Sequence, residues 1–297
     1  MTPFELAEPK TLNEAIALLD AEDPEVRPIS GGTALMLMMK SGVFRPSRLV
    51  SLQKVEADYS RIERGGNGTL RIGALASLSQ IEHSGEVRQV APVIEKTMRH
   101  LSNVRVRNVA RLGGNLAHGD PHMDLPPVLS SLGAKAIVAG PSGQREIMIE
   151  ELFSGYYETV LDRNELITFV DVPSQAGWSS VYLKCTTRSA DDWPALGIAC
   201  SLRIENGTIG DVRLMISAAT EKLTRLVATE KVVRGQKVSE AIFERAGESA
   251  MSEAEVIGDS RGSASYKTEL VRVYVKRALR QAGLQVSLQA GSGVTQS

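Results

Sequence analysis

The sequence of 297 residues predicts an α+β protein in two parts: a two-part α/β domain over residues 1–175 and a smaller domain over residues 178–283. In the first part, the strand-forming segment Val26–Ser30 passes through a glycine turn into the helix-forming segment Ala34–Lys40. In the second part, two apolar segments flank Asn206-Gly207, which is the strongest short-range signal for a β-hairpin. Three helical stretches follow this hairpin and predict a helical layer beside the sheet.

The elements of the first part follow from local signals. Thr11 and Glu14 form a capping box ahead of the short helix 15–19. A strand at 48–52 completes a small βαβ-like subdomain over residues 1–57. The subdomain over residues 58–175 is expected to contain strands at 60–63, 69–73, 134–139 and 166–172 and helices at 77–82, 92–101 and 125–132.

The second part begins after Ser174-Gln175-Ala176-Gly177, the best linker candidate in the chain. Its hairpin strands are predicted at 196–204 and 209–217, and its helices at 224–233, 238–251 and 265–282. Gly283 is predicted to end the last helix, and residues 284–297 are predicted to form a disordered tail.

Two glycine pairs are the most informative motifs. They lie in the segments Ile29-Ser30-Gly31-Gly32-Thr33-Ala34-Leu35-Met36 and Arg111-Leu112-Gly113-Gly114-Asn115. A glycine pair lets the main chain approach a ligand closely and direct its amide N–H groups at phosphate oxygens, so two such loops could hold one long anionic ligand. An ordinary turn that needs a positive φ is an equally good explanation of either loop alone. Neither loop has the spacing of a Rossmann fingerprint or of a P-loop.

Asp124 opens the predicted helix 125–132 and has two possible roles. It can cap the helix, with Pro126 and Pro127 in the first turn and Gly133 at the end. It can also contact a ligand, and the local sequence does not decide between the two.

Composition excludes several classes of function. The net charge of −1 and the aromatic content of 4% give no support to nucleic-acid binding. The longest apolar run, Ala34–Met39, is too short for a membrane span, and the N-terminus does not resemble a signal peptide, so a cytoplasmic protein is expected. Cys185 and Cys200 form no Cys-x-x-Cys motif, and the four histidines form no metal-ligand pattern.

The combined motifs resemble the FAD-binding medium subunit of the molybdenum hydroxylases, the family of xanthine dehydrogenase and aerobic carbon monoxide dehydrogenase. The resemblance runs from about Phe4 to about Gly283. It implies a PCMH-type FAD-binding domain, followed by a three-stranded antiparallel sheet with a helical layer. The motifs that carry it are both glycine pairs, Ala117-His118, Asp120-Pro121, Asp124-Leu125-Pro126-Pro127, Tyr182-Leu183-Lys184, Arg188 and Asp192-Trp193-Pro194.

The resemblance also implies which residues bind FAD. The implied contacts are Ile29, Ser30, Gly31, Gly32, Thr33, Ala34, Leu35, Met36, Leu101, Arg111, Leu112, Gly113, Gly114, Asn115, Asp124, Leu166 and Lys184. Arg111 stands where the family usually has Thr or Ser, and Ala34 where it often has a polar residue. Lys184 is expected to place an ammonium near the flavin and to raise its reduction potential, although a solvent-facing strand lysine is the ordinary alternative.

The implied function is electron transfer within a heterotrimer. A large subunit would carry the molybdopterin-type cofactor, a small subunit would carry 2Fe-2S clusters, and this chain's FAD would pass electrons to an external acceptor, with a dimer of heterotrimers as the expected assembly. No catalytic residue is assigned in this chain. Two alternatives stay open: a self-sufficient FAD-dependent oxidase or reductase, for which the sequence offers no paired carboxylates or histidine constellation, and a scaffold module without a cofactor.

Overall fold

A computed structural model of the chain describes residues 3–292, which divide into two compact units. Unit 1 comprises the chain up to Gly119 together with Ala134–Val172, and unit 2 comprises Asp120–Gly133 together with the chain from Pro173 onward. The segment Asp120–Gly133 therefore belongs to the same unit as the C-terminal part, although it lies within the sequence range 1–175.

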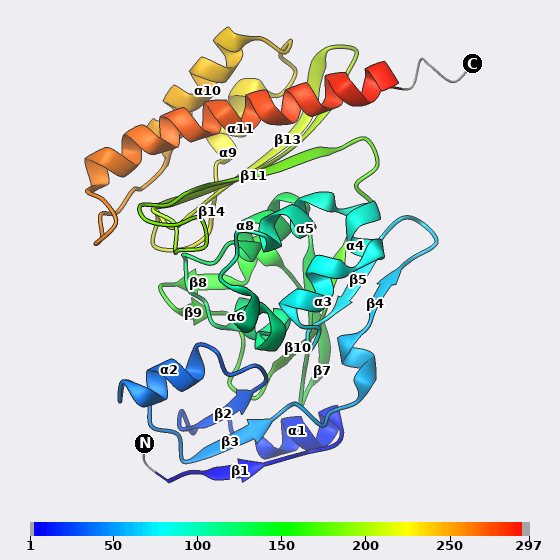
Figure 1. The fold of residues 1–297 in the computed structure, drawn as a ribbon, viewed down its shortest axis with the longest axis vertical. Helices are drawn as coiled ribbons and strands as arrows, with labels where there is room; N and C mark the ends of the chain where they lie inside the picture. The colour runs from blue at the N-terminus through cyan, green and yellow to red at the C-terminus, as the bar shows by residue number, and fades with distance from the viewer. Residues whose placement is uncertain (1–2, 293–297) are drawn as a thin grey trace. The chain divides into compact units, whose positions relative to one another are not determined.

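A small parallel sheet forms the N-terminal part of unit 1 (Figure 1). Its strand order is β1–β3–β2, with β1 at Glu5–Ala7, β2 at Val26–Ile29 and β3 at Arg48–Ser51. The predicted capping box is present at the start of α1 (Leu12–Leu18). The predicted strand, glycine turn and helix are confirmed by β2 and by α2 (Leu35–Lys40).

The second sheet of unit 1 has the antiparallel order β4–β5–β10–β6–β7. Its strands are β4 (Ile62–Arg64), β5 (Leu70–Gly73), β6 (Lys135–Gly140), β7 (Gly143–Met148) and β10 (Leu166–Val172). Unit 1 also contains the helices α3 (Leu78–His83), α4 (Gly85–Val90), α5 (Pro92–Met98), α6 (Val104–Val109) and α7 (Leu112–Ala117), and the short strands β8 (Phe153–Gly155) and β9 (Glu158–Thr159).

The sequence did not predict α4, α6 or β7. In α6 the alternation of valine and arginine is typical of a strand, but the Asn103 side chain accepts hydrogen bonds from the amides of Arg105 and Val106 and starts a helix. Local capping thus outweighs strand propensity here.

Unit 2 contains an antiparallel sheet of order β11–β12–β13–β14. Its strands are β11 (Ser179–Cys185), β12 (Leu196–Glu205), β13 (Thr208–Ser217) and β14 (Thr224–Arg225). The predicted hairpin is confirmed, and its turn residues Asn206 and Gly207 have φ values of 51° and 76°. The sheet has a fourth, two-residue edge strand where the start of a helix was predicted.

A β-bulge interrupts the hairpin close to its turn. Ile204 pairs with Ile209 and Arg203 pairs with Asp211, so Gly210 has no partner on β12. The bulge allows Ile209 and Val212, which are three residues apart, to face the same apolar layer.

The two faces of this sheet have different chemistry. On one face, Leu196, Ile198 and Cys200 of β12 pack in the apolar cluster formed with α9 (Val227–Val233), α10 (Glu240–Glu253) and α11 (Ala264–Ser292), which cover this face in Figure 1. On the other face, Ser201 donates a hydrogen bond to Ser131 of α8 (Leu125–Ser131) at 3.1 Å. The sheet therefore has one apolar face and one face of small and polar residues.

The last helix is longer than the sequence predicts. Gly283 lies inside α11, which continues to Ser292, so the prediction of a disordered tail from residue 284 is wrong for residues 284–292. Gly283 does not adopt the positive φ that would end a helix, so it continues α11. A Cβ at Gly283 would lie 3.6 Å from Phe243 of α10, so the glycine also lies beside that helix. Residues 293–297 lie outside the described chain. Among residues 3–292, every helix is too short or too polar to cross a membrane.

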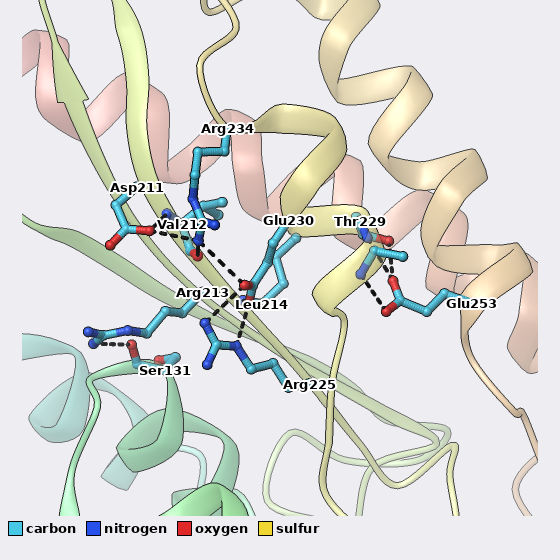
Figure 2. Close-up of polar contacts among 11 residues, drawn as sticks. Ser131, Asp211, Val212, Arg213, Leu214, Arg225, Thr229, Glu230, Arg234 and Glu253 are labelled. Atoms are coloured by element: carbon cyan, nitrogen blue, oxygen red, sulfur yellow. Dashed lines mark hydrogen bonds and ion pairs between the residues drawn. The ribbon is translucent and has the colours of Figure 1, made fainter.

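Glu230 joins α9 to the sheet of unit 2 (Figure 2). Its carboxylate is 2% exposed and accepts hydrogen bonds from the Leu214 amide at 2.9 Å and from two nitrogens of Arg225 at 2.9 and 3.0 Å. Arg234 lies 3.8 Å away. A buried carboxylate with these partners is expected to be costly to remove.

We expect Glu230→Gln to lower the free energy of unfolding by about 2–4 kcal/mol, because Arg225 and the Leu214 amide would lose a charged acceptor. Urea denaturation measures this change. Glu221→Gln, at an exposed position, is the matched control and should change stability by less than about 0.5 kcal/mol. Equal effects of the two substitutions would contradict the structural role of Glu230.

Candidate functional site

The first glycine segment forms a half-buried loop between β2 and α2. Gly32 has a φ of +68°, and the Met36 amide donates to the Gly32 carbonyl at 2.9 Å. Within the described residues, the amides from Gly31 to Leu35 have no hydrogen-bond partner in the protein. Adjacent amides of this kind are suited to anionic oxygens.

The second glycine segment is the first turn of a helix and not a loop. Arg111 is extended and pairs with Ser77 in an antiparallel bridge, and α7 begins at Leu112. The amides of Leu112 and Gly113 donate to the carbonyls of Ala76 and Ala74 at 3.1 and 2.8 Å. These two amides are therefore occupied within the protein, and the predicted FAD contacts of this segment stay a prediction.

Gly113 and Gly114 differ in what surrounds them. A Cβ at Gly113 would lie 2.9 Å from the Cβ of Ala74, so this glycine allows close packing inside the protein. A Cβ at Gly114 would meet only the Ser30 hydroxyl, at 3.1 Å. Gly114 thus leaves space beside the first glycine segment.

The two glycine segments lie against each other within unit 1. A Cβ at Gly31 would lie 2.4 Å from the Val109 carbonyl oxygen and 2.8 Å from the Ala110 Cα, so main chain meets main chain at this point. Gly114 approaches Ser30 from the same segment. The fold brings together two motifs that are distant in sequence, as their proposed binding of one ligand requires.

Leu101 and Leu166, the remaining implied FAD contacts in unit 1, are buried residues. Both residues are 5% exposed, and Leu166 packs in an apolar cluster with residues of α1, β2 and β3. Arg107 donates to the Leu101 and Ser102 carbonyls at 3.3 and 2.8 Å and to Glu82 at 2.9 Å. The arginine therefore holds the chain at Leu101 and is itself paired with Glu82.

Asp124 forms a buried polar group with Tyr182 and Lys184 in unit 2. The Tyr182 hydroxyl donates to one carboxylate oxygen at 2.6 Å, and the Lys184 ammonium donates to the other at 2.9 Å. The lysine and aspartate side chains are only 7% and 6% exposed. Asp124 makes no side-chain cap on α8, so the prediction that it caps the helix is wrong, and so is the alternative of a solvent-facing Lys184.

The sheet of unit 2 explains this arrangement. Tyr182 and Lys184 are two residues apart on β11 and so share a face, which is the polar face that α8 contacts. Gly197 of β12 lies opposite Lys184, and a Cβ there would lie 2.7 Å from the Tyr182 hydroxyl and 2.4 Å from the Ser217 hydroxyl. The missing side chain at Gly197 leaves room for the tyrosine to reach Asp124.

Tyr182 remains protonated in this environment. Burial and the Asp124 carboxylate raise the pKa of the phenol well above its usual value of 10. The sequence motif contained Tyr182, but only the pairing with Asp124 reveals its role as a hydrogen-bond donor to that carboxylate. In the part of the chain that the structure describes, no three His, Cys, Asp or Glu side chains are placed to hold a metal ion.

Two family models match the chain. The model described as "FAD binding domain in molybdopterin dehydrogenase" matches residues 2–175, and the model described as "CO dehydrogenase flavoprotein C-terminal domain" matches residues 181–282. Together they cover nearly the whole sequence.

Characterised relatives are similar over almost their full length. The nicotine 6-hydroxylase medium subunit of Paenarthrobacter nicotinovorans is 32% identical, with 93% of this chain and 96% of the relative covered. The glyceraldehyde dehydrogenase medium chain of Sulfolobus acidocaldarius is 28% identical, with 94% and 98% covered. A carbon monoxide dehydrogenase structure from Hydrogenophaga pseudoflava has a TM-score of 0.91 and 30% identity, with 96% of this chain and 99% of the matched chain covered.

We expect Gly31→Ala to destabilise the protein by about 1–3 kcal/mol, because the new methyl group would overlap the main chain of Val109 and Ala110. Thermal or urea unfolding measures the loss. Gly66→Ala is the matched control, since a Cβ at Gly66 meets nothing within 4 Å. If Gly31→Ala were as stable as Gly66→Ala, the close main-chain contact would be absent in solution.

Proposed function

Because this chain belongs to the family of FAD-binding medium subunits of the molybdenum hydroxylases, we propose that it transfers electrons within a multi-subunit dehydrogenase. The chain is a flavoprotein subunit of an oxidoreductase, with FAD as its cofactor. One observation in the structure carries the proposal: the Gly31–Leu35 amides lack protein partners and lie in the segment against which Gly114 packs.

The residues of unit 1 fit an anionic dinucleotide. The two glycine segments contain no carboxylate, and the half-buried amides of the first can donate to diphosphate oxygens. The proposed FAD contacts in unit 1 are Ile29–Met36, Arg111–Asn115, Leu101 and Leu166. Since Leu101 and Leu166 are buried, we expect their contribution to come from the main chain.

Unit 2 is proposed to contribute Asp124 and Lys184. The two form a buried ion pair, so Lys184 does not act as an isolated positive charge. Tyr182 donates to the same carboxylate and keeps it in place. The division into an FAD-binding domain at 1–175 and a C-terminal domain at 178–283 is also a proposal, supported by the ranges of the two family models.

The proposed partners are a large subunit with the molybdopterin-type cofactor and a small subunit with 2Fe-2S clusters, in a dimer of heterotrimers. The relatives are named as medium chains or subunits, which supports a place in a larger complex. This chain has two cysteines, whereas a 2Fe-2S cluster usually takes four thiolates, so the electrons that reach the FAD would come from a partner. Bound FAD would supply the electron-accepting and electron-donating chemistry. A location in the cytoplasm stays a prediction from the sequence.

We expect the purified chain to be yellow, with about one FAD per chain, and to be inactive alone on organic substrates. Gly114→Ala should keep its fold, because the methyl group meets only the Ser30 hydroxyl, but should bind FAD about tenfold or more weakly. Titration of FAD into the chain from which FAD has been removed, followed by flavin fluorescence, measures the affinity, with Gly66→Ala as the control.

Three results of this experiment would each remove a different claim. A folded, colourless chain that ignores added FAD would falsify the proposed function. Bleaching of the flavin by a substrate without any partner would favour a self-sufficient enzyme. Unchanged FAD affinity in Gly114→Ala would show that the space beside Ser30 is not used by the cofactor.

We expect Lys184→Met to lower the reduction potential of the bound flavin by about 30–60 mV, which corresponds to about 1.5–3 kcal/mol for a two-electron couple. The substitution leaves the Asp124 carboxylate buried without its cation, and the added negative field disfavours the reduced, anionic ring. Redox titration of the flavin absorbance measures the potential. Lys237→Met, at an exposed position, should not change it, and an unchanged potential in Lys184→Met would place the pair away from the flavin.

A further inference from the structure

Helix α6 ends at the main chain that packs against Gly31, yet it buries little of its own surface. None of its six residues is buried, and Val104 and Val109 are 57% and 48% exposed. A helix this short depends on tertiary contacts for its stability. Contacts other than apolar packing must therefore fix α6 at the place where it meets Gly31.

Arg107 makes a charged contact of this kind between α6 and α3. Its Nε donates to Glu82 Oε2 at 2.9 Å and its Nη2 donates to Glu82 Oε1 at 3.4 Å, so the guanidinium binds both oxygens of the carboxylate. The two side chains are only 12% and 14% exposed. A pair in this fork geometry fixes the orientation of both partners as well as their distance.

The third nitrogen of the Arg107 guanidinium holds the turn that precedes α6. Nη1 donates to the Ser102 carbonyl at 2.8 Å and to the Leu101 carbonyl at 3.3 Å. Ser102 has a φ of 53°, which is unfavourable for a residue with a Cβ and persists only where neighbouring contacts hold it. One side chain thus joins the turn, α6 and α3.

The opposite end of α3 holds the chain that follows α6. The Leu78 amide donates to the Ala110 carbonyl at 3.0 Å, and Ser77 pairs with Arg111 in the antiparallel bridge. Leu78 itself is 1% exposed, so α3 is anchored in the core of unit 1. This buried helix therefore holds α6 at two points, through Arg107 near its own end and through Ala110 at its start.

We infer that Arg107 is a positioning residue for the proposed FAD site. Its pairing with Glu82 sets where α6 presents the main chain of Val109 and Ala110 to the loop at Gly31. Because these main chains are in close contact, a shift of α6 also moves the Gly31 loop, whose amides lack protein partners. The inference rests on the proposed function, since it gives Arg107 an effect on FAD affinity that acts through α6.

We expect Arg107→Lys to fold and to bind FAD about tenfold more weakly. An ammonium has three N–H donors and no planar fork, so it cannot replace the hydrogen bonds of Arg107 to Glu82, Leu101 and Ser102. Flavin fluorescence titration measures the affinity, and urea denaturation measures the stability. Glu82→Gln keeps the size of the acceptor side chain and should give a smaller effect of the same kind.

Arg225→Lys is the matched control. Arg225 makes an equivalent fork on the buried carboxylate of Glu230 in unit 2, with distances of 2.9 and 3.0 Å. The control should also lower the stability of the chain, but it should leave the FAD affinity within about twofold of wild type. The comparison separates a general loss of stability from an effect on the FAD site.

A double variant shows whether Arg107 acts through the contact at Gly31. Gly31→Ala disturbs the same contact from the other side, and we expect it to weaken FAD binding by about tenfold. Since both substitutions act on one contact, the double variant should bind FAD only slightly more weakly than either single variant. Losses that multiply to about a hundredfold would show independent action.

Hydrogen exchange of the chain without FAD tests the positioning independently of the cofactor. The Ala110 amide donates to the Val106 carbonyl at 2.8 Å, and the Leu78 amide donates to the Ala110 carbonyl. In Arg107→Lys these two amides should exchange about tenfold faster, whereas amides of the β12–β13 hairpin in unit 2 should keep their rates. Arg225→Lys should leave the rates of Ala110 and Leu78 unchanged.

The outcomes separate this inference from the proposed function. An Arg107→Lys chain that loses stability but keeps its FAD affinity overturns the inference, and so does an equal loss of affinity in Arg225→Lys. Independent action with Gly31→Ala, or unchanged exchange at Ala110 and Leu78, also overturns it. A wild-type chain that binds no FAD contradicts the proposed function, while the exchange rates still decide whether Arg107 fixes α6.

Discussion

The contact between the Gly31 main chain and the Val109–Ala110 main chain is the constraint on which the candidate site of unit 1 depends. A distance of 2.4 Å between a hypothetical Cβ and a carbonyl oxygen leaves no room for any side chain at residue 31. The contact brings the turn after β2 next to the residues that lead into α7. Without it, the unpartnered amides and the space at Gly114 would belong to separate surfaces. The two glycines of each pair thus have different functions. Gly31 and Gly113 allow close packing, whereas Gly32 adopts a positive φ and Gly114 leaves open space.

Unit 2 obtains its polar group from the contrast between the two faces of one sheet. The face that packs on α10 and α11 is filled by aliphatic side chains, and it supplies the apolar burial that a domain of this size needs. The opposite face carries glycine, alanine and serine on β12, which lets α8 approach closely and lets Tyr182 and Lys184 reach Asp124. Burial of an ion pair is costly unless its remaining hydrogen-bonding groups are satisfied, and the tyrosine hydroxyl satisfies one carboxylate oxygen here.

The sequence predicted those features that are determined locally. The capping box at Thr11, the turn after Ile29 and the hairpin at Asn206-Gly207 depend on neighbouring residues, and all three are present. The features that it missed depend on contacts between distant residues. Asp124 has the position of a helix cap, but its carboxylate is taken by a lysine 60 residues away. Gly283 has the position of a helix stop, but Phe243 packs beside it and α11 continues. The resemblance predicted which segments contact FAD, and that stays a prediction, whereas the occupied amides of Leu112 and Gly113 follow only from the pairing with Ala76 and Ala74.

The unpaired Gly210 has an effect well beyond the hairpin turn. Without the bulge, the register of the Ile204–Ile209 pair would extend along the whole of β12 and β13. Gly197 would then lie opposite Ile216 in place of Ser217. Each residue of β13 from Asp211 onward would then exchange faces, since side chains alternate along a strand. Val212 and Leu214 would face α8, and an isoleucine side chain would occupy the space that the Tyr182 hydroxyl uses. The additional residue Gly210 therefore keeps the aliphatic side chains of β13 on the sheet face that packs against the helices. It also keeps the opposite face, next to the Asp124 carboxylate, polar.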